Sequence, residues 1–223
     1  MLIDHQQKNS KIALVADSKF DREFWEQLWS NTLREHPDKV ARRAPNASLV
    51  AQLANLPPGR ALDAGCGHGA ESLWLAARGW QVVAVDFSAA ALAQGRATAL
   101  AAGEEIAARI DWIEGDLASW KSEPERYDLV VCLHVHIAGP VEEMVRRMAE
   151  GVAPGGMLFL AGHRSLDPDT GVATATTKQV QVSVESAVAA LEPAAWEFIT
   201  ADERPRVVNG PGIDSVICAR RRT

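Results

Sequence analysis

The chain has 223 residues, 47% of them hydrophobic, and a formal net charge of −6. This composition is typical of one globular domain with a sizeable core and excludes an intrinsically disordered chain. Because an acidic surface is a poor electrostatic match for phosphates, we expect no nucleic-acid partner. No apolar run approaches the ~20 residues of a membrane helix, so no membrane partner is expected either.

Two further features bear on where the chain works. The amino-terminal residues lack the apolar stretch of a secretion signal, which favours the cytoplasm. The three cysteines, Cys66, Cys132 and Cys218, lie far apart in the sequence. Their spacing predicts neither a disulfide framework nor a zinc site, and we interpret them as buried small residues.

The first predicted elements are helices. Between Asp21 and Leu33, apolar side chains recur four residues apart, which predicts a helix with one wide apolar face. The pairs are Phe24 with Leu28 and Trp25 with Trp29. A short helix is predicted over Ala47–Leu53, after a polar stretch and before a Pro-Pro-Gly break. We therefore predict a helical cap or lid over residues 1–55 and a main unit over 56–223, within one structural domain.

From residue 60 onward, short apolar strands alternate with helical segments. The predicted strands are Arg60–Ala64, Gln81–Asp86, Arg109–Ile113, Tyr127–Leu133 and Met157–Leu160. Helices are predicted over Ala70–Ala77, from the N-cap Ser88 to about Ala102, and along the apolar face that runs from Val141 to Met148. Such alternation implies a parallel sheet whose two faces are covered by helices.

The pattern changes after the fifth strand. Residues 164–181 form a polar stretch whose length indicates a functional loop. A helix over Val184–Leu191, capped by Ser183, precedes two strands over Trp196–Ala201 and Ile213–Ala219. With no helix between them, these strands are expected to form an antiparallel hairpin. The predicted fold class is α/β: a Rossmann-like, doubly wound, seven-stranded, mostly parallel sheet with an antiparallel C-terminal hairpin.

A glycine-rich loop follows the first strand, within Asp63-Ala-Gly-Cys-Gly-His-Gly69. Its glycines permit sharp turns and close approach of a ligand, and the next helix points its amides at that ligand. The second strand ends at Asp86, 21 positions after Gly65, where a carboxylate can accept both ribose hydroxyls of a nucleoside. A nicotinamide dinucleotide site would need a glycine where Ala70 stands. A carboxylate at Asp63 suits a ligand with an ammonium group rather than one with phosphates.

These segments resemble the motifs of class I S-adenosylmethionine-dependent methyltransferases. The glycine loop resembles motif I, and the other matching segments are Val85–Ser88, Glu114–Leu117, Tyr127–Val131 and Ala153–Leu158. The resemblance covers about residues 56–160. The N-terminal aromatic residues and the C-terminal hairpin are also similar to bacterial small-molecule members related to the tellurite-resistance and thiopurine methyltransferases.

The resemblance implies S-adenosylmethionine as the cofactor. Asp63 would hold the methionine ammonium, Asp86 the ribose and Asp116 the adenine amino group, although Asp116 is also a typical turn residue. The implied cofactor-binding set is Asp63, Gly65, Cys66, Gly67, Asp86, Phe87, Asp116, Leu117 and Leu133. Where amino methyltransferases of nucleic-acid bases resemble one another in an Asn/Asp-Pro-Pro-aromatic turn, this chain has Leu133-His-Val-His136, which favours a small-molecule acceptor.

The candidate catalytic residues are His134 and His136, which leave the fourth strand beside the expected methyl position. Either can be a general base or orient the substrate, or both can be ordinary polar residues of a strand end. A metal site completed by His163 is a third interpretation, but no carboxylate lies at a suitable spacing, and we predict no metal.

Four residues are candidates for substrate binding. His163 and Arg164 end the fifth strand and can contact a polar substrate or be solvated loop residues. Trp25 and Trp29 can form a lid that walls the acceptor pocket, or simply pack in the core. We expect methyl transfer to oxygen, nitrogen or sulfur of a small molecule. The alternatives are a catalytically silent nucleoside-binding module and a nicotinamide-dependent oxidoreductase, and the oligomeric state is left open.

Overall fold

The computed structural model of the protein describes residues 22–136, 140–165, 181–205 and 212–223. Its helices are α2 (Arg22–Glu35), α3 (Pro37–Ala41), α4 (Ala47–Leu53), α5 (Ala70–Ala77), α6 (Ala89–Ala102), α7 (Glu104–Ala107), α8 (Val141–Glu150) and α9 (Val184–Ala190). Its strands are β1 (Arg60–Ala64), β2 (Gln81–Asp86), β3 (Ile110–Glu114), β4 (Tyr127–Leu133), β5 (Val152–Ser165), β6 (Trp196–Pro205) and β7 (Gly212–Arg221).

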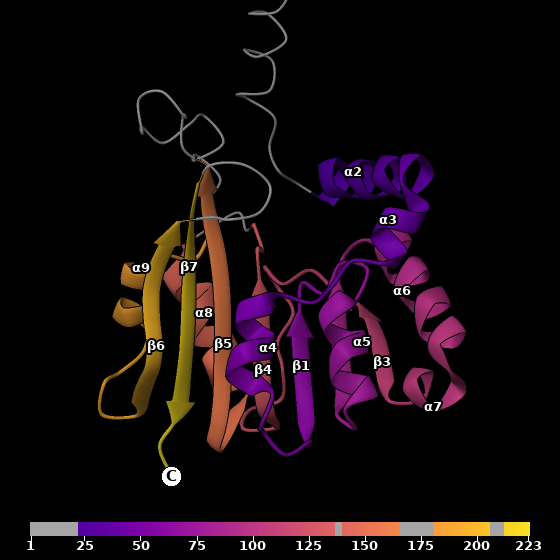
Figure 1. Cartoon of the computed structure of the whole chain (residues 1–223). Coiled ribbons are helices and arrows are strands. Elements are labelled where there is room, and N and C mark those ends of the chain that lie inside the picture. Colours follow the sequence, from indigo (N-terminus) through magenta and orange to yellow (C-terminus); the bar gives the residue numbers. More distant parts are fainter. Residues whose placement is uncertain (1–21, 137–139, 166–180, 206–211) are drawn as a thin grey trace, which may run out of the picture.

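All of these strands belong to one seven-stranded sheet of order β3-β2-β1-β4-β5-β7-β6. The first five strands pair in parallel, whereas β7 lies antiparallel between β5 and β6. Figure 1 shows helices on both faces of this sheet. The predicted fold class is therefore confirmed.

The structure corrects the bounds of several predicted elements. The strand β5 begins at Val152 rather than at Met157, and β6 ends at Pro205 rather than at Ala201. Two short helices, α3 and α7, lie in stretches where no helix was predicted. The fifth strand was predicted to end at Leu160, but β5 continues to Ser165 because β7 pairs with it as far as Ser165↔Gly212. The backbone at Arg164 is therefore strand rather than loop, and residues 166–180 of the predicted loop lie outside the described residues.

Local signals explain where the helices begin. The Ser88 hydroxyl accepts a hydrogen bond from the Ala91 amide at 3.2 Å and caps α6. Ser183 and Ser186 form a reciprocal capping box at the start of α9. In α8, the side chains at i, i+3, i+4 and i+7 are all buried, as the apolar periodicity predicts: Val141, Met144, Val145 and Met148.

The core has two halves, one on each face of the sheet. Alternate residues of β4 show the division: Val130 packs with α8 and α9, and Val131 packs with α4, α5 and α6. Burial on both faces accounts for the continuous apolar run of this strand. Leu49 and Leu53 of α4 are also buried here, so this helix belongs to the core. Burying one such leucine stabilises the fold by about 1.5–3 kcal/mol.

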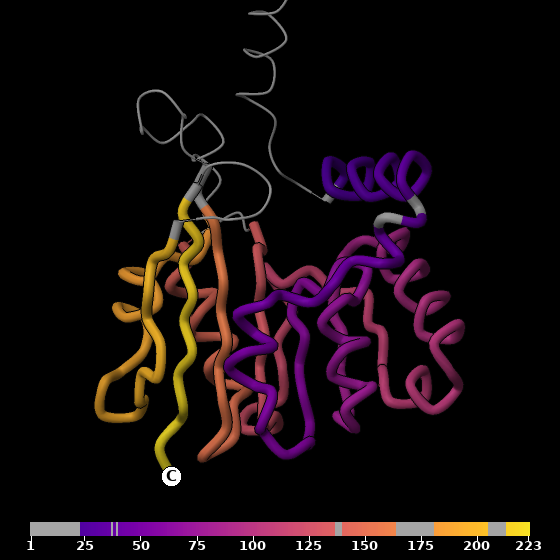
Figure 2. The backbone as a smooth tube through the Cα atoms, in the orientation of Figure 1, coloured from indigo at the N-terminus to yellow at the C-terminus, as the bar shows by residue number. Residues whose placement is uncertain are grey.

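The helix α2 is placed differently from the helices that cover the sheet. Figure 2 shows it as an indigo tube beyond the carboxyl ends of the parallel strands, on the side of β1–β3. It is attached to α6 by a hydrogen bond from the Ala90 amide to the Glu26 carboxylate at 3.2 Å. Because ligands of doubly wound sheets bind at the carboxyl ends of the strands, α2 lies where a lid would lie.

The remaining expectations concern cysteines and membranes. Cys66, Cys132 and Cys218 are free and buried, which confirms their interpretation as small core residues. Within the described ranges, no helix has the length and apolar character needed to span a bilayer.

Candidate active site

The glycine loop between β1 and α5 depends on backbone that only glycine adopts readily. Gly65, Gly67 and Gly69 have φ values of 78°, 53° and 81°. A Cβ atom at Gly67 would lie 2.8 Å from the Trp29 ring, and one at Gly65 would overlap Val135. Trp29 of α2 and Val135, which follows β4, therefore pack directly against the main chain of the loop.

Asp86 organises this loop from the end of β2. One carboxylate oxygen accepts from the Gly67 amide at 2.8 Å, and the other accepts from the Ser88 amide at 2.9 Å. Burial raises the pKa of Asp86, and these two amides oppose that shift. Since each carboxylate oxygen has two acceptor sites, Asp86 retains acceptor capacity for a ligand.

Asp63 and Glu71 lie close to Asp86 and share the buried side of the loop. Asp63 is 2% exposed and accepts from the Ser72 hydroxyl at 2.6 Å. Burial, followed by the charge of Glu71, raises the pKa of Asp63 to about 7. Burial also raises the pKa of Glu71, which accepts from the Asn46 amide at 2.9 Å. The loop therefore carries an excess of buried negative charge that a cationic ligand would relieve.

A cavity of about 670 Å³ opens over the loop. Eight of the nine predicted cofactor residues line it: Gly65, Cys66, Gly67, Asp86, Phe87, Asp116, Leu117 and Leu133. Asp63 is not among the lining residues, and Glu71 and Arg43 are. Asp63 therefore lies behind the cavity wall, whereas Glu71 lines the cavity as Asp86 and Asp116 do.

Sequence reasoning missed Arg43 and Glu71. Arg43 stands in the polar stretch between predicted helices, and Glu71 is in the first turn of α5. Periodicity marks neither residue, because charged side chains at such places are usually solvated. The nearest available signal was the position of Glu71, two residues after the last glycine of the loop.

Asp116 is a turn residue that also lines the cavity. Its carboxylate accepts from the Ala118 amide at 2.9 Å, which is the geometry of a turn residue. Asp116 also lines the cavity, together with Leu117 and Ala118. The turn hydrogen bond orients a carboxylate that has further acceptor capacity for an adenine amino group.

The two candidate catalytic histidines and His163 meet at this cavity. Nδ1 of His134 lies 3.0 Å from Nδ1 of His163, and the His134 backbone is left-handed with φ 56°. Nε2 of His136 lies 2.7 Å from the side-chain nitrogen of Gln181. Burial, with the charge of His163 adding to it, lowers the pKa of His136 to about 4.

Among the described residues, no group of three His, Cys, Asp or Glu side chains could hold a metal ion. The prediction that the protein uses no metal therefore remains a prediction. The side chain of Arg164, a candidate substrate contact, lies outside the described part of the chain.

The tryptophans of α2 roof the cavity. Trp25 stacks on the His136 ring with 5.0 Å between centroids, and Trp29 lies 5.4 Å from the His68 ring. Both tryptophans line the cavity and neither belongs to a core cluster. His68 is almost fully buried, and burial, with the charge of Arg43, lowers its pKa to about 4.

Comparison with known proteins shows what this chain is similar to. Residues 61–156 match a family model described as a methyltransferase domain. The match includes the glycine loop and β2, β3 and β4, and it covers less than half of the chain. Ubiquinone biosynthesis O-methyltransferase from Xanthomonas campestris pv. campestris is 34% identical over 114 residues, which is 50% of this chain and 46% of that protein. The chain therefore matches about half the length of this curated relative.

Other similarities extend the comparison. Ribosomal RNA small subunit methyltransferase C from Chromohalobacter salexigens is 36% identical over 113 residues, covering 48% of this chain and 32% of that protein. The magnesium protoporphyrin IX methyltransferase of Synechocystis PCC 6803, solved with bound S-adenosylmethionine, has a TM-score of 0.63 and 21% identity over 92% of this chain and 99% of that chain. A Mesorhizobium loti methyltransferase has the same TM-score at 19% identity, over 82% of this chain and all of that one. At these identities the solved structures establish the fold.

The residues present fit S-adenosylmethionine, the cofactor that the sequence resemblance implies. The buried carboxylates suit a ligand that carries an ammonium and a sulfonium. The acceptor capacity left on Asp86 suits a ribose, and the glycine loop lines the same cavity as this carboxylate.

Proposed function

We propose that this protein transfers a methyl group from S-adenosylmethionine to a hydroxyl oxygen of a small aromatic molecule. The observation that carries the proposal is a single cavity lined both by the glycine loop with Asp86 and by His134, His136 and His163. An imidazole at this place can remove the proton that a hydroxyl nucleophile must lose. Trp25 and Trp29 add an aromatic wall.

The cofactor roles follow from the positions of the lining residues. We propose that Asp86 binds the ribose hydroxyls and that Asp116, Leu117 and Phe87 surround the adenine. Glu71 faces the cavity and would hold the methionine ammonium, with Asp63 supporting it from behind. Arg43, as the cation in the same wall, would bind the methionine carboxylate.

Chemistry in this site is mainly positioning. When bound, S-adenosylmethionine supplies a methyl group on a positively charged sulfur, and this charge is neutralised as the methyl leaves. The chain's own residues exclude water with the aromatic roof, orient the acceptor and hold its proton on an imidazole. Leu133, at the end of β4, and Val135 line the same cavity beside the histidines.

The small-molecule acceptor is supported over a nucleic acid by charge and by the fourth-strand turn. The net charge of −6 opposes binding of a polyanion, and the turn lacks the motif of enzymes that methylate base amino groups. The oxygen acceptor is supported by the name of the ubiquinone relative. A narrower relationship to tellurite-resistance or thiopurine methyltransferases stays a prediction, as does a cytoplasmic location.

We further propose that α2 and α3 act as a lid. Because Leu49 and Leu53 of α4 are buried in the core, the lid excludes α4 and is shorter than the 1–55 unit predicted from sequence. A variant that begins at Arg43 should keep the sheet folded, bind cofactor more weakly and expose the cavity. Global unfolding of this variant would show that α2 is part of the core.

Calorimetric titration with S-adenosylhomocysteine, beside one with NAD, tests the cofactor assignment. We expect micromolar or tighter binding of the first and none of the second. A screen of small phenols, heterocycles and thiols should then yield a methylated phenol and S-adenosylhomocysteine. Binding of S-adenosylhomocysteine without turnover would favour a silent regulatory module, and selective binding of NAD would favour an oxidoreductase.

A further inference from the structure

The contact between His134 and His163 is not the one that regular strands would make. The parallel register pairs Leu133 with Ala161, so regular continuation would set His134 beside Gly162. Side chains alternate between the faces of a sheet, and His163 would then lie on the opposite face from His134. Instead their Nδ1 atoms are 3.0 Å apart.

The backbone of His134 explains how the two rings meet. Its φ of 56° is left-handed, a conformation that costs a non-glycine residue free energy. The His134 amide still donates to the Ala161 carbonyl at 2.7 Å, so the turn occurs where β4 stops. Strain of this kind persists where surrounding structure imposes it, and here it brings one imidazole onto another.

An Nδ1–Nδ1 hydrogen bond restricts which ring nitrogens carry protons. One ring donates and the other accepts, so a single proton lies between the two Nδ1 atoms in the neutral pair. If Nδ1 of His134 donates, its Nε2 carries the lone pair of a base. When that Nε2 takes a proton, the Nδ1 hydrogen bond to His163 becomes charge-assisted and stronger. In that tautomer, His163 stabilises the imidazolium that forms on His134.

Gln181 determines which ring nitrogen of His136 carries the proton. The Gln181 side-chain oxygen accepts from the His163 amide at 2.6 Å, so its nitrogen is the end that faces His136. That nitrogen donates to Nε2 of His136 at 2.7 Å, which leaves the proton of the neutral ring on Nδ1. The ring also stacks on Trp25, and burial holds its pKa at about 4. His136 is thus kept neutral with its lone pair already engaged.

We propose that His134, hydrogen-bonded through Nδ1 to His163, takes the acceptor's proton at Nε2, and that Gln181 is a positioning residue that keeps His136 neutral. This assignment rests on the proposed methyl transfer to a hydroxyl. The acceptor oxygen forms the new bond to the methyl carbon, the carbon–sulfur bond breaks with its electron pair going to sulfur, and the hydroxyl proton goes to His134. Solvent then receives that proton.

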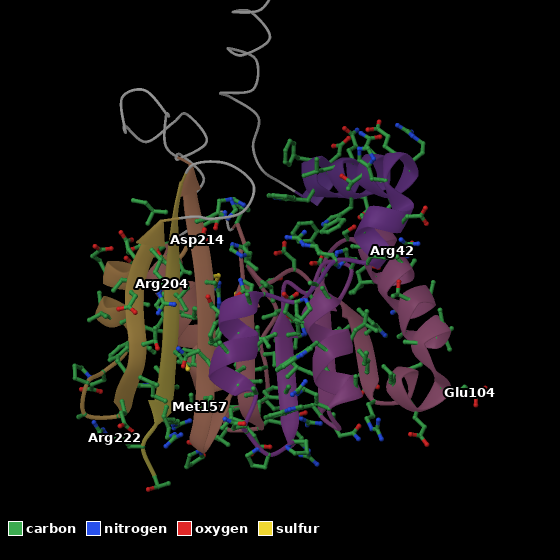
Figure 3. The ribbon with its side chains drawn as sticks, viewed as in Figure 1. Arg42, Glu104, Met157, Arg204, Asp214 and Arg222 are labelled. Atoms are coloured by element: carbon green, nitrogen blue, oxygen red, sulfur yellow. The ribbon has the colours of Figure 1, made fainter. Side chains whose placement is uncertain are left out.

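Two charged residues lie in register with His163 across the sheet, Asp214 on β7 and, beside it, Arg204 on β6. Asp214 is the cross-strand partner of His163 on β7, and residues directly opposite in an antiparallel pair share a face of the sheet. Figure 3 labels Asp214 at the upper end of the hairpin, on the edge of the sheet that bears the cavity. From α2 the neighbour is the neutral ring of Trp25, which packs on His136.

Nitrogen-15 NMR of the histidine-labelled full chain, saturated with S-adenosylhomocysteine, tests the proton inventory. We expect His136 to carry its proton on Nδ1 and to stay neutral from pH 8 to pH 5. We expect His134 and His163 to take up one shared proton in that range. Ordinary titration of His136, or independent uptake of two protons by the pair, would overturn the proposal.

Gln181→Glu is the variant that separates positioning from structural support. The carboxylate can still accept from the His163 amide, but it reverses the polarity toward His136, whose proton should move to Nε2 and whose pKa should rise. Gln81→Glu, at the exposed start of β2, is the matched control and should change neither. An unchanged His136 tautomer in Gln181→Glu would overturn the role of Gln181.

Turnover of histidine variants tests the base. Asparagine tolerates the left-handed backbone, so His134→Asn removes the base without forcing a new turn. We expect its kcat to fall by about 100-fold or more, with KM and binding of S-adenosylhomocysteine nearly unchanged. His136→Asn should lose less than about tenfold.

These measurements distinguish failure of the base assignment from failure of the proposed function. A larger loss in His136→Asn than in His134→Asn would overturn the base assignment and leave the proposed function intact. Absence of turnover by the wild-type chain with every hydroxyl acceptor would instead reject the proposed function, and the base assignment with it.

Discussion

Asp86→Asn tests the central electrostatic claim about the cofactor site. The carboxylate accepts from the amides of Gly67 and Ser88 and is proposed to accept two ribose hydroxyls as well. A carboxamide offers one acceptor oxygen and carries no charge, so the hydrogen bonds to the ribose lose their charge assistance. The loss amounts to about 1.5–3 kcal/mol, which raises Kd by about 10–150-fold.

The effect on the empty protein should be much smaller. Burial raises the pKa of Asp86, which means that its ionised form is disfavoured in the fold, and the charge of Glu26 adds to this. Removing the charge therefore offsets part of the cost of the disturbed amide contacts. We expect the free energy of unfolding at neutral pH to change by only about 1 kcal/mol.

Calorimetric titration with S-adenosylhomocysteine and thermal unfolding measure the two quantities separately. Asp111→Asn, at an exposed position of the adjacent strand β3, is the matched control and should leave both unchanged. A Kd for Asp86→Asn within about threefold of the wild type would refute the ribose assignment. Unfolding of the variant would show that the loop, rather than the ligand, depends on this charge.

Three further predictions follow from the same contacts. Arg43→Met should weaken binding of S-adenosylhomocysteine by about 10-fold or more, measured by calorimetry, because the ligand carboxylate loses its cation. The pKa of Asp63 is raised to about 7, so the folded protein holds a proton that the unfolded chain releases near pH 4. The empty protein should therefore lose stability as the pH rises from about 4 to about 7, and the unfolding temperature of Asp63→Asn should vary less with pH. Gly95→Ala should destabilise the fold by about 1–3 kcal/mol in urea, because its Cβ would lie 2.5 Å from the Trp112 ring; an unchanged midpoint would contradict this.

Much of the architecture could be read from local patterns. The bounds of β1, β2 and β4 agree with the predicted strands, because each is a short apolar run ended by a glycine, an acid or a polar turn. Ser88 and Ser183 marked helix starts correctly, since capping depends only on neighbouring residues. The length of β5 was underestimated, because pairing with β4 begins at Val152 and pairing with β7 extends to Ser165, and both are contacts distant in sequence.

The cofactor half of the site was also accessible from sequence. The glycine loop, Asp86 and Asp116 follow successive strands, and the carboxyl ends of parallel strands meet at one edge of the sheet. Asp63 lies near the end of the first strand, but its buried carboxylate does not line the cavity, so its contact with the ligand stays a prediction. Glu71 and Arg43 line the cavity because of how α5 and the segment before α4 pack, and this packing is not visible in the local sequence.

The sequence by itself determined the class of fold and the kind of cofactor, because both depend on periodicity and on motifs of a few adjacent residues. Only the tertiary structure decided how the histidines are paired. His134, His163 and Gln181 come from three separate segments, and their hydrogen bonds depend on one left-handed residue and on the register of two strands. No local pattern encodes the direction of a hydrogen bond between side chains that the fold brings together.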